Sequence, residues 1–291
     1  MPTNYPSDFD NFPAHGAQMD DTPTHDDAHV DLEDAVEAIQ AELGLNPAGA
    51  EDTVSERIAA VGADHTVVAY TSPGAFTFTK ADYPWAKWVR VRVVGGGGGS
   101  GGCETTAADE RAEAPGAGGG GFSEKSLLIG ALAASETVTV GAAGTAGIGG
   151  SPGIATAGGT GGESSFGAHC SAGGGTGSNV GRASNVSIND TRGVGGSGSG
   201  GDFNVRGSAG SNGVLVDDGS ELWPSMQNDG GAAAGSIGGG SSATAPGFAA
   251  NAVAGAPYGG GASGGRVDNS DLTGVVGAAG GAGAVIVEVF S

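Results

Sequence analysis

The stretch Trp88–Gly99 (WVRVRVVGGGGG) joins two kinds of sequence that predict different backbone structures. Its first seven residues alternate valine with arginine, as in a β-strand that has one apolar face. Five glycines follow directly. Of the 62 glycines in the chain, all but five lie after position 94, far above the ~7% of an average protein. The junction therefore separates a part rich in side chains from a part that must pack mainly through its backbone.

A second alternating stretch, Ala284–Phe290 (AVIVEVF), ends the glycine-rich region. Its valines share one face, and Glu288 lies on the other. We infer that this strand and Trp88–Val94 belong to one sheet, where Glu288 would lie across from Arg90 or Arg92. The intervening chain would then be one closed domain that the backbone enters and leaves at the same end.

Two further strands are expected just upstream, at His65–Thr71 and Ala75–Thr79. The turn Ser72-Pro73-Gly74 separates them. Together with Trp88–Val94 they predict a small β unit over residues 63–94.

Inside the glycine-rich region the glycines recur at every third position in short runs, such as Gly141–Gly153. A helix with three residues per turn places such residues on one face, so that several segments can approach within backbone contact. We therefore predict polyglycine II-type packing. Collagen shares the period, but here the register breaks after a few triplets. A flexible Gly/Ser linker would require neither the repeated register nor the bracketing strands.

Less repetitive insertions interrupt the glycine runs, and we expect them to form loops at the ends of packed rods. They are Cys103–Pro115, Ser164–Cys170, Asn179–Arg192, Val214–Asp229, Thr244–Tyr258 and Arg266–Thr273. Binding residues concentrate on loops that a rigid scaffold carries. The candidate receptor loop is Val214–Asp229, through Leu222, Trp223 and Met226.

The N-terminal part is acidic, with fifteen Asp and Glu against Arg57 alone in residues 1–64. Residues 1–30 contain four prolines and no apolar periodicity, which predicts an extended docking arm that orders against a partner. They show no signal-peptide pattern, so we expect synthesis in a cytoplasm. The net charge of −21 argues against nucleic acid and against an anionic membrane.

Residues 31–62 predict two short amphipathic helices with apolar residues spaced by four and three positions. The apolar seam consists of Leu32, Val36, Ile39, Leu43, Val54, Ile58 and Val61. Because so thin a seam buries little area in a monomer, we predict that it trimerises as a coiled coil. The alternative is that the two helices pack on each other within one chain.

We predict no catalytic, cofactor-binding or metal-binding residue, and hence no enzyme. The GxGxxG match at Gly193–Gly198 is expected by chance in so glycine-rich a chain. His25 and His29 could ligate a metal if that stretch were helical, but nothing predicts a helix there. Neither cysteine has a histidine placed to activate it, apart from the adjacent pair His169-Cys170, and sequence neighbours seldom share an active site. The two cysteines allow one disulfide at most.

The predicted fold class is mixed. It comprises an extended arm (1–30), a short trimeric α-helical coiled coil (31–62), a small β unit (63–94), a glycine-rich polyglycine II-type domain (95–283) and a closing strand (284–291).

Several of these stretches resemble tail fibre and minor tail proteins of siphophages that infect actinobacteria. Residues 25–61 (HDDAHVDLEDAVEAIQAELGLNPAGAEDTVSERIAAV) resemble their N-terminal helical module. The glycine-rich domain of these proteins is similar to FTFTKADYPWAKWVRVRVVGGGGG, GGGGFSE, ETVTVGAAG and GGAGAVIVEVF. The resemblance covers nearly the whole chain.

The resemblance implies a homotrimer that attaches to other tail proteins through its N-terminal arm. Its glycine-rich part would face the host and contact a cell-surface receptor, a glycan or wall polymer. We expect a structural and adhesive tail component of the virion, without membrane insertion. The chain has no long shaft and no recognisable hydrolase domain, which favours a short tip protein. The alternatives are a purely structural virion protein, such as a capsid decoration or tail-tip spacer, and a glycine-rich ice-binding or wall protein.

Overall fold

The computed structural model of the chain describes residues 32–39, 65–186, 188–217, 222–224, 229–234, 251–268 and 270–291. The chain divides into two compact units, Met1–Asp64 and His65–Ser291. In the first unit the described residues form one α-helix, residues 32–39. In the second unit the described residues form strands, long extended segments and two short 3-10 helices, η1 (Lys80–Asp82) and η2 (Ile129–Ala131).

The predicted mixed fold with a trimeric coiled coil is wrong. The described residues are mainly β, and among them only one α-helix and no coiled coil are found. The described residues of that helix span two turns, whereas a coiled coil needs apolar spacing sustained over several heptads. Leu32 and Ile39 on it are 61% and 59% exposed, and Val36 is half-buried. The other seam residues, Leu43, Val54, Ile58 and Val61, lie outside the described residues.

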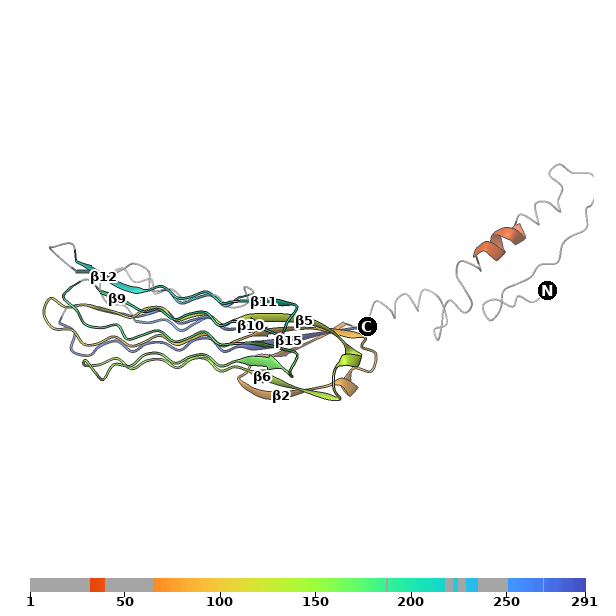
Figure 1. The fold of residues 1–291 in the computed structure, drawn as a ribbon, viewed down its shortest axis with the longest axis horizontal. Helices are drawn as coiled ribbons and strands as arrows, with labels where there is room; N and C mark the ends of the chain where they lie inside the picture. Colours follow the sequence, from red (N-terminus) through yellow and green to blue (C-terminus); the bar gives the residue numbers. More distant parts are fainter. Residues whose placement is uncertain are drawn as a thin grey trace, which may run out of the picture. The chain divides into compact units, whose positions relative to one another are not determined.

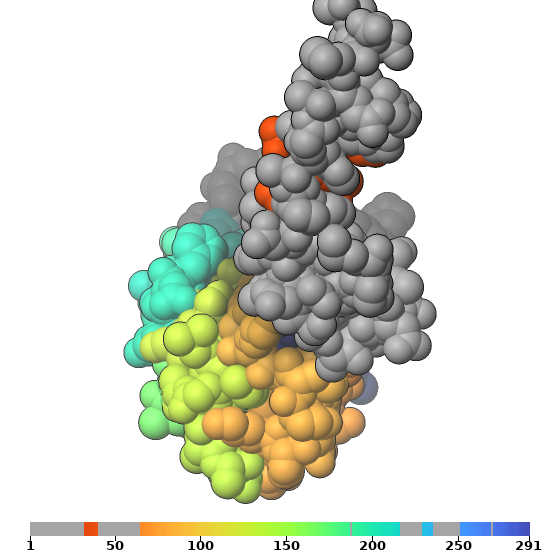
Figure 2. All heavy atoms as spheres, turned by 90° about the vertical axis from the view of Figure 1, so that its right-hand side faces the viewer, coloured from red at the N-terminus to blue at the C-terminus, as the bar shows by residue number. Residues whose placement is uncertain are grey.

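At one end of the second unit, two five-stranded antiparallel sheets pack face to face (Figure 1). The first sheet has the order β1 (His65–Tyr70), β15 (Ala284–Phe290), β3 (Trp88–Val94), β5 (Phe122–Leu128) and β11 (Phe203–Val205). The second has the order β10 (Gly198–Ser199), β8 (Cys170–Ala172), β7 (Ser164–Phe166), β6 (Ser135–Val140) and β2 (Gly74–Thr79). We call this end the strand end. Figure 2 looks onto it and shows β1 to β3 in orange beside the yellow-green β5 to β6 region.

The core between these sheets follows from the alternation along the strands. The valines at positions 89, 91 and 93 of β3 are fully buried, and so are those at 285, 287 and 289 of β15. Phe78, Val138 and Phe166 cover them from the second sheet. Burial of about 25 cal/mol per Å² of apolar surface makes this sandwich the principal hydrophobic core of the described residues.

The prediction that the two bracketing strands share one sheet is confirmed. β15 pairs antiparallel with β3, and Glu288 lies directly opposite Arg90. Arg90 Nε donates to Glu288 Oε2 at 2.8 Å, and Arg92 donates to Oε1 of the same carboxylate. The chain therefore enters and leaves the glycine-rich region at the strand end.

Beyond the sandwich, the strands continue as long extended segments that we call the glycine bundle (Figure 1). Its segments are residues 95–103, 116–121, 141–150, 156–162, 173–181, 193–197, 207–212, 229–234, 259–264 and 275–283. Most of them extend a strand directly, as 95–103 extends β3. The order of the strands therefore decides which glycine segments are neighbours.

Backbone hydrogen bonds hold the bundle together in all lateral directions. In the central segment 95–103, successive N–H groups other than that of Gly101 donate to three different neighbours in rotation, and the partner repeats at every third residue. Its carbonyl oxygens accept from three further neighbours in the same way. The six neighbours are segments 116–121, 144–150, 156–162, 175–181, 259–264 and 275–281. A backbone with three residues per turn produces this rotation.

Glycine is required where these backbones touch. A Cβ built on Gly97 would lie 2.0 Å from the carbonyl oxygen of Gly260, and one on Gly98 would lie 2.2 Å from that of Thr176. Real Cβ atoms essentially never come within 3.0 Å of another heavy atom. The absence of side chains therefore sets the spacing of the bundle.

Two small sheets close the opposite end. One has the order β13 (Leu222–Pro224), β12 (Gly213–Asp217) and β9 (Ile188–Asp190), and the other pairs β14 (Arg266–Val267) with β4 (Ala112–Glu113).

Candidate functional site

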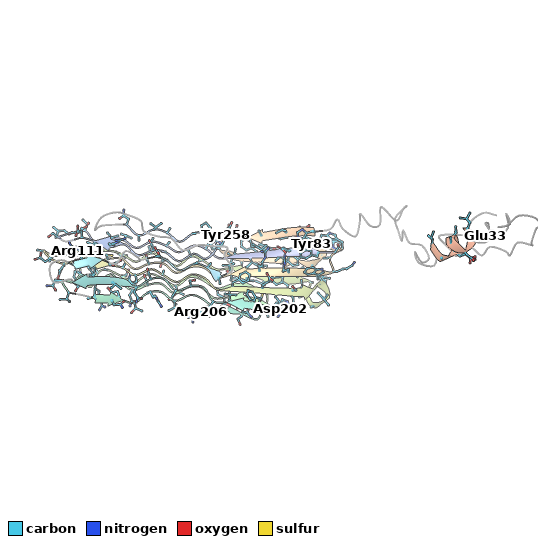
Figure 3. The ribbon with its side chains drawn as sticks, turned by 90° about the horizontal axis from the view of Figure 1, so that it is seen from above. Glu33, Tyr83, Arg111, Asp202, Arg206 and Tyr258 are labelled. Atoms are coloured by element: carbon cyan, nitrogen blue, oxygen red, sulfur yellow. The ribbon has the colours of Figure 1, made fainter. Side chains whose placement is uncertain are left out.

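Several insertions between the glycine runs meet at the end of the second unit that is remote from the sandwich. This loop end comprises the described residues of 103–115, 148–156, 179–190, 213–217 and 266–275. Single β-bridges connect its loops: Cys103 bridges both Gly181 and Val275, and Arg111 bridges Ser184. Figure 3 labels Arg111 at this end and Tyr83 at the strand end. These contacts bring together segments that lie far apart in the sequence.

Polar side chains cross-link these loops. Arg111 Nε donates to Asp268 Oδ1 at 3.1 Å. Thr106 Oγ1 donates to the Asp268 carbonyl oxygen and accepts from the Asp271 N–H at 3.0 Å. Hydrogen bonds from the Thr273 hydroxyl and backbone N–H hold the pKa of Asp271 below its ordinary value. Such fixed contacts order the loops as one surface.

A second group of cross-links ties residues 179–190 to this surface. Arg182 Nε donates to Asp190 Oδ1 at 2.8 Å, and the Asp190 side chain is almost fully buried. The Ala183 N–H donates to Glu104 Oε2 at 2.9 Å. The loop is therefore held by hydrogen bonds to the carboxylates of Asp190 and Glu104.

Between these polar contacts the loop end exposes aliphatic side chains on adjoining segments. Ile148, Ile154, Leu272 and Val276 are each more than half exposed, and Leu272 reaches 86%. The segments that carry them are joined by backbone hydrogen bonds, such as Gly277 N–H to the Gly147 carbonyl at 2.9 Å. Single exposed apolar residues are ordinary, whereas a group of them on one rigid surface is typical of a binding surface.

The described residues of the predicted receptor loop lie at the same end. Leu222 and Trp223 belong to β13, which pairs antiparallel with β12, and β12 pairs on its other side with β9. Met226 lies outside the described residues. The assignment of these three residues to receptor contact stays a prediction.

The cysteines and His169, which could suggest enzymatic chemistry, are buried or bonded to other groups. Burial raises the pKa of the Cys103 thiol to about 12 and that of Cys170 to about 11, which disfavours the reactive thiolate. Both cysteines are buried and free, so no disulfide joins them. His169 Nε2 lies 3.1 Å from Glu136 Oε1, within hydrogen-bonding distance, so this ring nitrogen already has a side-chain partner.

The GxGxxG stretch Gly193–Gly198 is part of the glycine bundle. Its Gly193 and Gly196 N–H groups donate to the carbonyls of Gly116 and Gly119 at 2.9 Å. A phosphate-binding loop needs its N–H groups free for the ligand. These donors are already bonded to backbone carbonyls, which argues against a phosphate site at this stretch.

The described ranges contain neither a cluster of metal-ligating side chains nor a helix able to span a membrane. No three His, Cys, Asp or Glu side chains gather there as metal ligands would. None of the helices in those ranges has the length and apolar character that a membrane crossing requires.

A backbone-bonded glycine bundle, closed by a β-sandwich and carrying a cross-linked loop surface, defines a scaffold that displays loops. The pattern of the family described as "glycine-rich domain" matches residues 71–290. The chain belongs to this glycine-rich domain family. No curated protein matches the chain.

Proposed function

We propose that this protein is a structural and adhesive component of a phage tail, a minor tail protein or short tail fibre, whose loop end contacts the host surface. The observation that carries the proposal is the loop end itself. Loops distant in sequence converge there on a scaffold whose lateral hydrogen bonds come from the backbone. Because that scaffold does not depend on the loop side chains, the loops can change to fit a receptor without unfolding it.

The resemblance of residues 25–61 and of the glycine-rich stretches to siphophage tail proteins supports the assignment to a tail. The rotating backbone partners of the bundle support polyglycine II-type packing, which the resemblance also implies. In this proposal the acidic N-terminal residues attach the chain to other tail proteins, and the receptor is a host glycan or wall polymer. The homotrimer stays part of the proposal, without a coiled coil to hold it.

Binding to host cells tests the adhesive role. Fluorescently labelled full-length protein would be applied to actinobacterial cells together with a variant of the loop end, Ile154→Asp/Leu272→Asp. The control is Leu128→Asp, which places one carboxylate on a 71% exposed leucine of the strand end. We expect the loop-end variant to bind at least about tenfold more weakly, equivalent to ~1.4 kcal/mol, and the control to bind as the parent does.

A Trp223→Ala variant addresses the predicted receptor loop, and we expect it to weaken binding as well. Equal binding by all variants would contradict the adhesive role. Gold-labelled antibody on virions tests the location, and labelling at the tail tip is expected. Labelling on the capsid, with no host binding, would instead support the alternative of a purely structural virion protein.

A further inference from the structure

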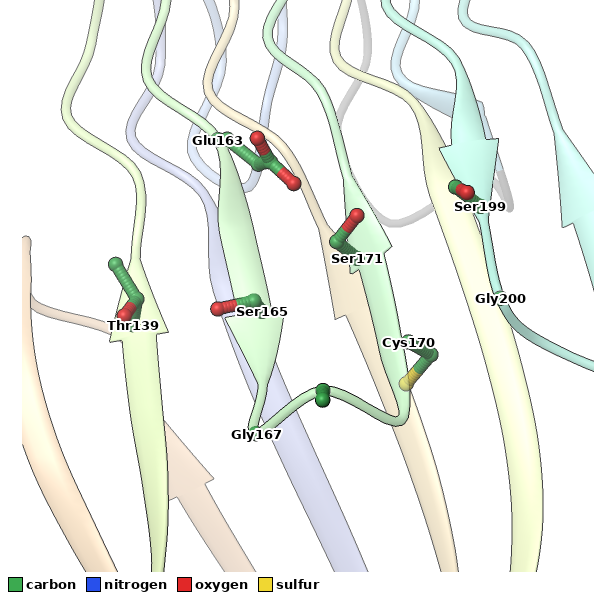
Figure 4. Close-up of a pocket in the computed structure, with 9 residues that line it drawn as sticks. Thr139, Glu163, Ser165, Gly167, Cys170, Ser171, Ser199 and Gly200 are labelled. Atoms are coloured by element: carbon green, nitrogen blue, oxygen red, sulfur yellow. The ribbon is translucent and has the colours of Figure 1, made fainter.

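A hollow lies on the outer face of the second sheet, away from the loop end. It has a volume of about 410 Å³ and opens to solvent across β6, β7, β8 and β10 (Figure 4). Most of its polar lining comes from Thr139, Glu163, Ser165, Ser171 and Ser199. We call these five residues the hydroxyl groove.

The four hydroxyl residues stand in direct register on neighbouring strands. Thr139 pairs with Ser165, Ser165 with Ser171, and Ser171 with Ser199. Side chains in register on antiparallel strands project from the same face, and adjacent strands lie about 4.8 Å apart. The sheet therefore presents a row of four hydroxyl groups across four of its five strands.

The alternation of burial confirms which face carries the row. Val138, Phe166 and Cys170, each next to a row residue, are buried in the core. Thr139, Ser165 and Ser171 are half-exposed and Ser199 is exposed. The row consequently belongs to the solvent side of a sheet whose other side is fixed by packing.

Within the described part of the chain, none of these four hydroxyls and neither oxygen of the Glu163 carboxylate has a hydrogen-bond partner. A hydroxyl offers one donor and two acceptor sites, whereas a carboxylate only accepts. The groove thus offers four hydroxyls that can each donate and accept, and one acidic acceptor, in a hollow rather than on a flat surface.

One side of the groove is cross-linked. Lys125 Nζ donates to the carbonyls of His169 at 3.2 Å and Gly200 at 2.7 Å, and so ties together the chain segments that contain these two residues. Gly167 and Gly200 adopt φ values of +49° and +74°, which favour glycine. A site that is already ordered loses less conformational entropy when it binds.

We propose that the hydroxyl groove binds a neutral carbohydrate chain. A sugar carries the same mixture of hydroxyl donors and acceptors, repeated along its length. None of the residues lining the hollow is cationic, and Glu163 repels phosphate or sulfate groups, so an anionic polymer fits poorly. The hollow lies at the strand end, so the proposal does not rest on the adhesive role of the loop end.

The test is a titration of isotope-labelled full-length protein with neutral hexasaccharides, observed through the amide resonances. The probes are hexamers of N-acetylglucosamine, mannose and α-1,4-linked glucose. We expect at least one of them to shift resonances of β6, β7, β8 and β10 below about 10 mM, in the weak range typical of a few neutral hydrogen bonds. No shift with any of the three, or shifts confined to other strands, would overturn the proposal.

Two variants separate the groove from the rest of the sheet face. Thr139→Val/Ser165→Ala/Ser171→Ala removes three hydroxyls of the row, and we expect at least about tenfold weaker binding. Thr137→Val is the matched control, because Thr137 lies on the same face of β6 outside the hollow, and its affinity should stay within about twofold. If the triple variant bound as tightly as the parent, the row would not be the site.

The charge of the groove gives an independent readout that does not depend on the triple variant folding. A sulfated form of the bound hexasaccharide should bind the parent protein more weakly than the neutral form. Glu163→Gln should reduce this difference, because the repelling carboxylate is gone. A preference for the sulfated form would contradict the assignment to a neutral carbohydrate.

Discussion

At Gly99, the backbone of a neighbouring segment occupies the space where a side chain would begin. A Cβ built there would lie 2.0 Å from the Thr145 carbonyl oxygen and 2.6 Å from its carbon. Neither atom can rotate away, since both belong to a backbone that is hydrogen-bonded on other sides. The conformational freedom of glycine is secondary here, and its lack of volume is what the packing requires.

We expect Gly99→Ala to lower the free energy of unfolding by at least about 2 kcal/mol, because the methyl group forces two hydrogen-bonded segments apart. Gly130→Ala is the matched control: no heavy atom lies within 4 Å of a Cβ at Gly130, so the change should be neutral or slightly stabilising. Denaturant unfolding of both variants measures the difference. Equal stability of the two would show that the bundle is looser than described.

In the central segment, the Gly101 N–H is the one donor that lacks a backbone acceptor, and the Ser178 hydroxyl takes that place. This hydroxyl accepts from the Gly101 N–H at 3.1 Å and donates to the Pro115 carbonyl at 2.7 Å, so it relays a bond that the two backbones do not make directly. The side chain is fully buried. The hydrogen bonds that Ser178 makes to two backbone groups therefore explain why a glycine segment contains a buried serine.

Removing this single hydroxyl should lower the free energy of unfolding substantially. Ser178→Ala leaves a buried donor and a buried acceptor unpaired, at about 1–3 kcal/mol each. Ser208→Ala removes the same hydroxyl from an exposed position of the bundle and should change stability by less than about 0.5 kcal/mol. Thermal or denaturant unfolding would compare the pair, and a difference below 0.5 kcal/mol would argue against the relay.

At the scale of elements, the pairing of β3 with β15 closes the molecule, and Glu288 joins them electrostatically. Burial alone would raise the pKa of this carboxyl, but the hydrogen bond from Arg90 and the charges of Arg92 and Arg90 outweigh it and lower the pKa. A group whose pKa is lower when folded stabilises the fold above its unfolded pKa. That contribution is lost as the pH falls through the folded value.

We therefore expect the free energy of unfolding to decrease as the pH is lowered below about 4.3, the ordinary value for Glu. Glu288→Gln should be less stable than the parent at pH 7, and the difference should shrink in acid. Glu163→Gln, which alters a carboxylate without a partner in the described residues, should leave the stability at pH 7 unchanged. Unfolding curves at several pH values provide the measurement, and a constant difference between Glu288→Gln and the parent would contradict the account.

The bracketing strands could be predicted from the sequence because alternation and opposite charges encode their pairing, as with Glu288 and Arg90. The short strands β7 and β8 could not, since three residues each give no periodicity. The neighbours of each glycine segment could not be predicted from the sequence either, because a segment without side chains has no residue pattern that specifies its partner. Their arrangement follows from the strands they extend.

At the N-terminal helix, the spacing of apolar residues predicts the helix but not its assembly. Leu32, Val36 and Ile39 do follow the spacing of an amphipathic helix, and a helix is found there. The inference failed at the next step, from one thin apolar face to a coiled coil. A few apolar positions broken by Asn46-Pro47 cannot define the register that several consecutive heptads provide.

The loop end was foreseen in part. That insertions would form loops beside a rigid scaffold follows from their composition, but which of them share one end depends on long-range bridges such as Arg111 to Ser184. The hydroxyl groove gave no sequence signal at all. Its members are separated in the chain, and only the register of four strands places Thr139 and Ser199 in one row.

Across the second unit, side chains stabilise one part and backbone hydrogen bonds stabilise the other. The sandwich is held by buried valines and phenylalanines, whereas the bundle is held by lateral hydrogen bonds between glycine segments. A net hydrogen bond contributes about 0.5–1.5 kcal/mol, so many of them together can replace a hydrophobic core of side chains. The glycine bundle is therefore an ordered, hydrogen-bonded rod.

Amide hydrogen exchange of residues 95–103 in the full-length protein distinguishes an ordered rod from a flexible chain. In the structure their N–H groups are buried and hydrogen-bonded to neighbouring segments. We predict that they exchange as slowly as the amides of β3, in the most protected class of the molecule, because both open only with global unfolding. Exchange of Gly96–Gly102 at the rate of a free chain, beside a protected β3, would contradict the account and identify the region as a flexible linker.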